Sequence, residues 1–237
     1  REVCSLRNRE AMGKAISIQT ANARFQQIEA LLANRTKRYR TRLFLVQSVR
    51  AIKTGLALGG EVAAVLTPHG VRLSEWAASV GRDAPEHITL AASLHARLAE
   101  RDDGAEVVAV FKMPSHRIED LASCETVVVL DRPQYPGNIG TVLRSADALG
   151  HVPVVIVGHA ADPYDPKAIR ASMGSIFAVP VVSFPGSLKD LKAELRAFSF
   201  IAFDERGSGA LPELQFPKKV AFLFGNEERG FSVAGRE

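Results

Sequence analysis

The chain has few of the residues that mark secreted, metal-binding or membrane-spanning proteins. Its 237 residues include only two cysteines, Cys4 and Cys124, which are too few and too far apart for a disulfide framework or a cysteine-rich metal site. The six histidines show no helical i, i+4 pairing and no cysteine partner, so we expect no metal site. No apolar run approaches the roughly 20 residues of a membrane span, and the N-terminus lacks the apolar core of a secretory signal. We therefore expect a cytoplasmic protein with no membrane partner.

Basic residues are in excess, and they are unevenly distributed. Lysine and arginine outnumber aspartate and glutamate by 30 to 26, which gives a net charge of +4 and a pI near 9.2. The N-terminal part carries Arg1, Arg7, Arg9, Lys14, Arg24, Arg35, Lys37, Arg38, Arg40 and Arg42. Such clustering favours a polyanionic partner, because basic side chains release the counterions of nucleic acid. The alternative is a solvated surface, which is the usual role of a charge run.

Hydrophobic residues make up 46% of the chain, enough for two modest domains. We expect a basic flexible tail over residues 1–21, a small α/β module over 22–113, a linker over 114–124 and a second domain over 125–237. Apolar runs in the second domain predict strands at 126–130, 152–157, 179–184, 200–204 and 220–224. A helix is expected over 188–198. This alternation predicts an α/β fold with a parallel sheet covered by helices on both faces.

The most informative segment is Asp131–Gly150, where a strand leads through a turn rich in proline and glycine into a helix. Asn138 is a good N-cap, and Gly150 is a good terminator. The apolar stripe comprises Val142, Leu143, Ala146 and Leu149. Arg144, near the start of this helix, suits contact with phosphate. Alternatively, Asn138 merely caps the helix and Arg144 is a solvated charge. The segment contains no Gly-x-Gly-x-x-Gly, so nicotinamide binding is not favoured.

A second segment, Val220–Ser232, is another apolar strand that ends in Gly225, Asn226 and Glu227 and is followed by Gly230. Together the two segments resemble the first two signature motifs of the SpoU/TrmH family of RNA ribose 2′-O-methyltransferases, in the SPOUT superfamily. Residues 170–175, Arg-Ala-Ser-Met-Gly-Ser, resemble a helix of the same family, and residues 22–46 resemble the entry to its L30e-like domain. Within the family, the chain most resembles actinobacterial ribosomal-RNA methyltransferases that confer antibiotic resistance.

The resemblance implies a fold and an activity. The fold would be an α/β protein with a C-terminal SPOUT trefoil-knot domain, built on a parallel sheet, after a small L30e-like domain that binds RNA. The activity would be transfer of a methyl group from S-adenosylmethionine to a ribose 2′-hydroxyl, without a metal. Ribosomal RNA is favoured over transfer RNA as the partner, and a homodimer is expected.

The resemblance also implies roles for individual residues. Asn138, Arg144 and Glu227 match the catalytic positions. Because arginine stays protonated, we expect Arg144 to grip phosphate and assist deprotonation electrostatically, not to act as a base. The residues expected to bind the cofactor are Phe203, Asp204, Gly225, Asn226 and Gly230. Those expected to bind RNA are Arg35, Lys37, Arg38, Arg40, Arg42 and Arg170. For Arg170, a contact with a partner subunit or a structural salt bridge is an equal alternative.

The sequence departs from the family pattern in two places. A third motif, which closes the knot and lines the cofactor pocket, does not follow the second before Glu237. If the polypeptide ends there, a non-catalytic RNA-binding relative is the alternative function; if the sequence is part of a longer chain, the activity assignment stands. At Gln47 and Ser48 relatives often carry Glu-Gly, so RNA handling could differ there. A methyltransferase that acts on a base or a small molecule is a third, less favoured function.

Overall fold

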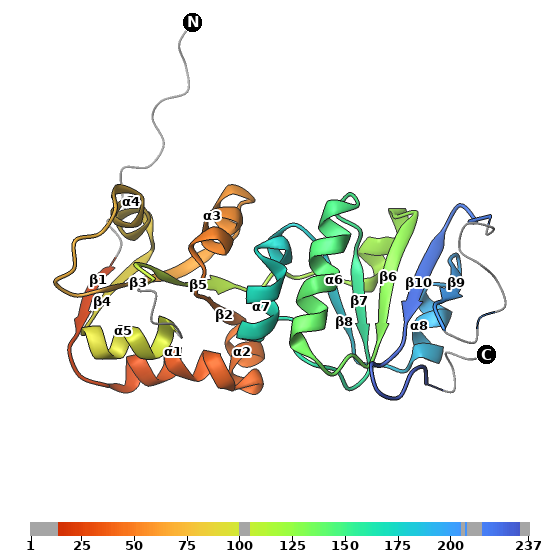
Figure 1. The fold of residues 1–237 in the computed structure, drawn as a ribbon, viewed down its shortest axis with the longest axis horizontal. Coiled ribbons are helices and arrows are strands. Elements are labelled where there is room, and N and C mark those ends of the chain that lie inside the picture. The colour runs from red at the N-terminus through yellow and green to blue at the C-terminus, as the bar shows by residue number, and fades with distance from the viewer. Residues whose placement is uncertain (1–13, 100–104, 205–206, 208–214, 233–237) are drawn as a thin grey trace, which may run out of the picture. The chain divides into compact units, whose positions relative to one another are not determined.

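The structure, a computed structural model, describes residues 14–99, 105–204, 207 and 215–232. The chain divides into two compact units, Arg1–Met113 and Pro114–Glu237. Each unit is built on its own β-sheet (Figure 1).

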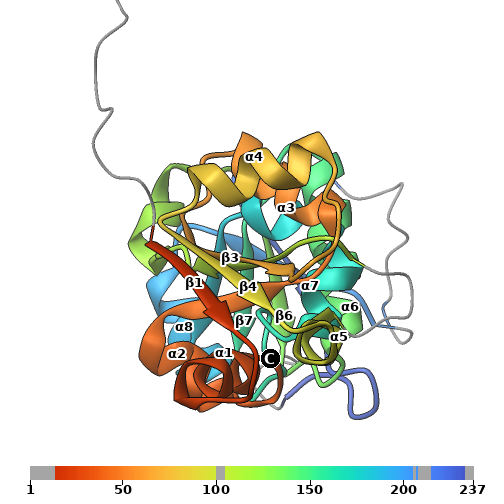
Figure 2. The same cartoon turned by 90° about the vertical axis from the view of Figure 1, so that its left-hand side faces the viewer.

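The first unit contains a mixed sheet of five strands among the described residues. Their spatial order is β1 (Lys14–Ile18), β4 (Glu86–Leu90), β3 (Val62–Pro68), β5 (Val108–Lys112) and β2 (Leu43–Val46). Strands β1, β4 and β3 run parallel, whereas β5 is antiparallel to both β3 and β2. The helices are α1 (Ala23–Ala33), α2 (Arg35–Thr41), α3 (Val49–Ala57), α4 (Glu75–Asp83) and α5 (Ala92–Ala99). Helices α3 and α4 cover one face, and α1, α2 and α5 lie on the other (Figure 2).

Strand β1 corrects the predicted tail. Residues 1–13 lie outside the described residues, but Lys14–Ile18 pair in parallel with β4 at the edge of the sheet. Ile18 is buried in the core, where it joins Phe25 and Ile28 of α1. The prediction was wrong here because a basic, polar context hid a short strand that is stabilised by pairing with β4 and by burial of Ile18.

The second unit contains a fully parallel sheet in the part of the chain that the structure describes. The strand order is β8 (Val181–Phe184), β7 (Val154–Val157), β6 (Thr126–Asp131), β10 (Val220–Phe224) and β9 (Ser199–Ala202). The other elements are η1 (Ile118–Ser123), α6 (Pro136–Ala148), α7 (Pro166–Ser172), η2 (Ser175–Phe177) and α8 (Leu188–Glu194). The predicted parallel sheet is therefore confirmed, with strand ends that differ by at most two residues from those expected.

The two faces of this sheet are covered differently. Val127, Val129 and Val155 project into a core that η1 and α8 cover, so η1 within the predicted linker packs as part of the second unit. Helix α6 lies over the opposite face, where α7 crosses it closely. The side chains that α6 leaves uncovered line a broad apolar cavity, described below.

Candidate active site

The carboxyl ends of β6 and β10 lie side by side, and the predicted motifs begin there. The two strands pair in parallel, with Phe224 opposite Leu130. The segments that follow them, 132–135 and 225–231, therefore leave the sheet at the same edge. In open α/β sheets this edge is where ligands bind.

Glu227 joins these two segments. Its Oε2 accepts a hydrogen bond from the backbone N–H of Gln134 at 2.9 Å. Its Oε1 accepts from Asn138 Nδ2 at 2.9 Å and from the backbone N–H of Tyr135 at 3.4 Å. Partial burial by itself would raise the pKa of Glu227, but these donors outweigh it and the pKa is lowered. The carboxylate is therefore ionised at neutral pH and acts here only as an acceptor.

Asn138 does not cap α6, which corrects the prediction. The helix begins at Pro136, with Tyr135 at the N-cap position and no side-chain cap. Proline suits the first helical position because it lacks an N–H and its φ is already helical. Asn138 consequently lies in the first turn, and its side chain reaches Glu227.

A second set of contacts holds loop 225–231 against the end of β6. Asn226 is buried; its Nδ2 donates to the carbonyl of Arg132 at 2.7 Å, and its Oδ1 accepts from the N–H groups of Glu228 and Arg229. Asp131, only 2% exposed, accepts from the backbone N–H of Ser232 at 2.7 Å and from Arg132 Nε at 3.0 Å. Neither Asp131 nor Arg132 was predicted as a site residue.

Two glycines allow this loop to fold tightly. A Cβ at Gly225 would lie 2.7 Å from the carbonyl carbon of Gly230, closer than two such atoms approach. Gly230 has a φ of +62°, which favours glycine. The backbones of Asn226 and Gly230 exchange two hydrogen bonds, at 3.0 and 2.9 Å. Both glycines are therefore required by the backbone, as expected for a loop that approaches a ligand.

A cavity of about 500 Å³ lies over this loop. It is lined by Phe203, Asp204, Phe224, Gly225, Asn226, Glu227, Glu228, Arg229, Gly230 and Phe231. All five residues expected to bind the cofactor are in this set. The ring of Phe203, at the end of β9, stacks on that of Phe224, with centroids 4.9 Å apart.

Arg144 lies on α6, two turns beyond Asn138, and it does not line this cavity. Its side chain is exposed, and it makes no hydrogen bond or ion pair with any other residue that the structure describes. A guanidinium in this state keeps its donors available for an incoming anion.

The residues expected to bind RNA have different environments. Arg35, Lys37, Arg40 and Arg42 are at least partly exposed on α2 or at its end, and Arg170 is exposed on α7. Arg38 is the exception: it is 2% exposed, and its Nη1 donates to the carbonyls of Leu31 and Leu32 at 2.7 and 3.0 Å. The prediction for Arg38 was therefore wrong, because this side chain caps the C-terminal turn of α1.

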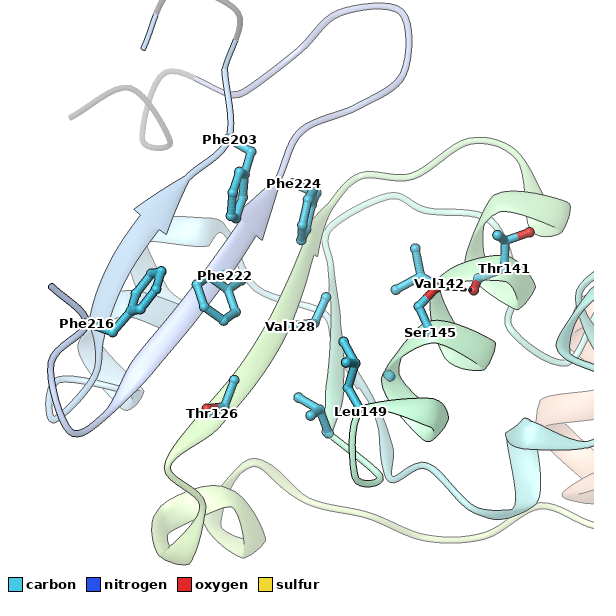
Figure 3. Close-up of a pocket in the computed structure, with 12 residues that line it drawn as sticks. Thr126, Val128, Thr141, Val142, Ser145, Leu149, Phe203, Phe216, Phe222 and Phe224 are labelled. Atoms are coloured by element: carbon cyan, nitrogen blue, oxygen red, sulfur yellow. Dashed lines mark hydrogen bonds between the residues drawn. The ribbon is translucent and has the colours of Figure 1, made fainter. Parts of the chain in front are cut away.

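A second cavity, of about 680 Å³, is almost wholly apolar (Figure 3). Phe222 and Phe224 of β10 face Val142 of α6 and Leu149, which directly follows α6, across it. Leu149 was predicted to be part of the helix's apolar stripe, yet it is 78% exposed.

No helix among the described residues is both long and apolar enough to cross a membrane.

Comparisons with known proteins identify the family. The SpoU rRNA Methylase family profile matches residues 125–237, and the SpoU L30e-like domain profile matches residues 22–109. The 23S rRNA (uridine(2479)-2′-O)-methyltransferase of Streptomyces viridochromogenes is 40% identical over 92% of this chain and 80% of its own length. The 23S rRNA (guanosine(2553)-2′-O)-methyltransferase RlmP of Bacillus subtilis is 28% identical over 91% of this chain and 85% of its own.

Solved structures give the same result. The SpoU methyltransferase AviRb from Streptomyces viridochromogenes, in complex with AdoMet, superposes with a TM-score of 0.83 at 39% identity, covering 91% of this chain and 85% of that one. An AdoMet-bound rRNA methyltransferase from Sinorhizobium meliloti has a TM-score of 0.80 at 28% identity, covering 93% of this chain and 85% of that one. The fold, the two-motif site and these relatives together show that the chain belongs to the SpoU rRNA methylase family.

Proposed function

We propose that this protein transfers a methyl group from S-adenosylmethionine to a ribose 2′-hydroxyl of ribosomal RNA. The observation that carries the proposal is the Glu227 carboxylate, which joins Asn138 of the first motif to the loop that lines the 500 Å³ cavity. Relatives that act on 23S rRNA support the choice of substrate.

The cavity suits the cofactor in size and chemistry. Small-molecule sites span about 300–1,000 Å³, and this cavity of about 500 Å³ falls in that range. Its lining is mainly polar, which suits the charged amino-acid part of the cofactor. Here the stacked rings of Phe203 and Phe224 form an apolar wall, and the exposed carboxylate of Asp204 lies beside them. The close approach of Gly225 to Gly230 lets the loop fold back tightly beside the cavity that it lines. When bound, S-adenosylmethionine supplies an electrophilic methyl group on a sulfonium.

Asn138 is oriented to hold the ribose hydroxyl. The ionised Glu227 can only accept hydrogen bonds, so the amide of Asn138 must turn its nitrogen toward that carboxylate. Its Oδ1 then points elsewhere and can accept a hydrogen bond from the 2′-hydroxyl. Holding the nucleophile in this way lowers the entropic part of the barrier.

Arg144 supplies positive charge. When the 2′-hydroxyl of a bound ribose loses its proton to solvent, the Arg144 guanidinium would stabilise the negative charge that develops on the oxygen. The same group can hold the phosphate next to the target ribose. Arg144 therefore acts on the substrate while remaining protonated throughout.

Loss of Arg144 tests this assignment. We expect Arg144→Ala to lower the rate of label transfer from methyl-labelled S-adenosylmethionine to a 23S rRNA transcript by about 100-fold or more. Arg196→Ala is the matched control, because Arg196 is exposed beside the other face of the sheet, near η1 and α8. Equal rates for both variants would contradict the role given to Arg144.

The enzyme is proposed to be a homodimer, as the family resemblance implies. The apolar cavity between β10 and α6 supports this, because Leu149, Phe216 and Phe224 are exposed there and parallel sheets are normally covered on both faces. Sedimentation equilibrium at the mass of one 25.6 kDa chain would contradict it.

A ribosomal RNA substrate implies that the enzyme acts in the cytoplasm. The resemblance to resistance enzymes suggests that methylation protects the ribosome from an antibiotic that binds it.

A further inference from the structure

Tyr135 lies at the edge of the proposed site, although no motif singles it out. It precedes α6, and 49% of its surface is exposed. Its backbone N–H donates to Glu227, and its hydroxyl donates to the carboxylate of Glu228. The residue is thus anchored at both its backbone and the tip of its ring by adjacent residues of loop 225–231.

The faces of this ring are available. The ring makes no aromatic or cation contact with another residue among those that the structure describes. An exposed aromatic residue is not unusual by itself. This one differs because its two anchors fix the ring before any ligand arrives, so that binding to its face costs little additional conformational entropy.

The hydrogen bond from the backbone of Tyr135 to Glu227 also places Tyr135 close to Asn138, which is proposed to hold the ribose hydroxyl. The Oε1 atom of Glu227 accepts from both Tyr135 N and Asn138 Nδ2. In a nucleotide, the carbon that carries the 2′-hydroxyl is bonded to the carbon that carries the base. A ribose held by Asn138 therefore brings its own base, or the next one along the strand, within reach of the Tyr135 ring.

We propose that Tyr135 is a stacking platform for an unpaired nucleobase of the RNA substrate, at or next to the methylated nucleotide. The inference rests on the proposed function and adds a specificity-determining residue to it. Proteins recognise single-stranded RNA largely by stacking splayed bases on aromatic side chains. The platform consequently selects a target in a loop or bulge over one in a duplex.

The phenol stays neutral in this role. The hydrogen bond to Glu228 and the negative charges of Glu228 and Glu227 raise the pKa of Tyr135. A neutral ring adds no charge to the interface, so its contribution to RNA binding does not depend on released counterions.

Variants of Tyr135 test the platform. Tyr135→Phe and Tyr135→Trp keep an aromatic face but lose the phenol, whereas Tyr135→Leu keeps apolar bulk without a π-face. Binding to a 23S rRNA transcript would be measured by filter retention between about 50 and 200 mM salt, the range in which phosphate contacts dominate salt dependence. We expect Tyr135→Leu to bind about 10- to 100-fold more weakly than Tyr135→Phe, with the same salt slope, whereas Arg144→Ala lowers the slope by about one.

The outcomes separate this inference from the function on which it rests. Equal affinities for the Leu and Phe variants overturn the platform, since the aromatic face would then contribute nothing to RNA binding. A changed salt slope in Tyr135→Leu overturns it too, because that result means lost phosphate contacts. A wild-type chain that neither binds nor methylates the transcript overturns the proposed function itself. Calorimetric titration of Tyr135→Leu with S-adenosylmethionine reports whether the cofactor cavity is intact, and a lost cavity also overturns the platform.

Discussion

Arg38 shows how burial decides the role of a charged residue. In the sequence it lies in a run of basic residues and looks equivalent to Arg35 or Arg40. In the structure its guanidinium satisfies two carbonyls in the last turn of α1, whereas Arg40 is exposed. Because helices leave their last carbonyls without intrahelical partners, an arginine that follows the helix can supply the missing donors.

The two arginines should therefore respond differently to the same substitution. Arg38→Met leaves the carbonyls of Leu31 and Leu32 buried without a donor, so we expect a loss of about 2 kcal/mol in the free energy of unfolding. Arg40→Met should leave stability unchanged, weaken RNA binding and lower its salt slope by about one. Denaturant unfolding of both variants checks this. If the midpoint falls for Arg40→Met and not for Arg38→Met, the assignment of Arg38 to the core is wrong.

Only part of the site could be predicted from the sequence. Glu227, Asn226 and the two glycines were predicted as site residues because the segment after the apolar strand resembles the second SpoU/TrmH motif. Tyr135 carried no such signal, because the partners that anchor it lie 92 and 93 residues away in the chain. Asn138 was wrongly predicted to be the N-cap for the same reason: its side chain donates to a distant carboxylate, and the helix already begins at Pro136.

The packing of α6 against α7 is the element-scale feature that positions the site. Helix α6 carries both Asn138 and Arg144, and α7 crosses it so closely that Gly140 has no room for a side chain. A Cβ at Gly140 would lie 2.4 Å from the carbonyl oxygen of Ala168 and 2.6 Å from the Cβ of Ala171. Neither atom belongs to a flexible side chain, so one helix would have to move.

Gly140→Ala should therefore cost about 1–3 kcal/mol of stability, and it should also lower methyl transfer because α6 is displaced. Gly137→Ala is a matched control on the same helix, since a Cβ there meets nothing within 4 Å. Alanine also has the higher helix propensity, so this control should be neutral or slightly stabilising. Thermal unfolding and transfer rates of the pair check the prediction. Similar behaviour of the two variants would mean that the helices are not in close contact.

Elements with long apolar runs were predicted best. Strand β10 has the predicted bounds, and β6 extends one residue further than expected. Both strands are almost continuously apolar, so hydrophobicity alone marks them. Strand β1 was missed because it is short, partly polar and at an edge, where pairing with β4 decides its structure.

At the scale of the whole molecule, the chain combines two units of different chemistry. The first displays arginine and lysine on α2, and the second places an acidic loop and an apolar wall around a cavity at the carboxyl edge of a parallel sheet. We propose that the first unit binds the RNA substrate and the second binds the cofactor, as the family resemblance implies. Binding energy from the first unit can then hold the target ribose at Asn138.

The central claim is that this site methylates the ribose of ribosomal RNA. The most direct measurement is to incubate the protein with methyl-labelled S-adenosylmethionine and a 23S rRNA transcript, digest the RNA to nucleosides and identify the labelled product. We predict label in a single 2′-O-methylated nucleoside, lost in Arg144→Ala and retained in Arg196→Ala. Label on a base, or label that persists without Arg144, would contradict the account.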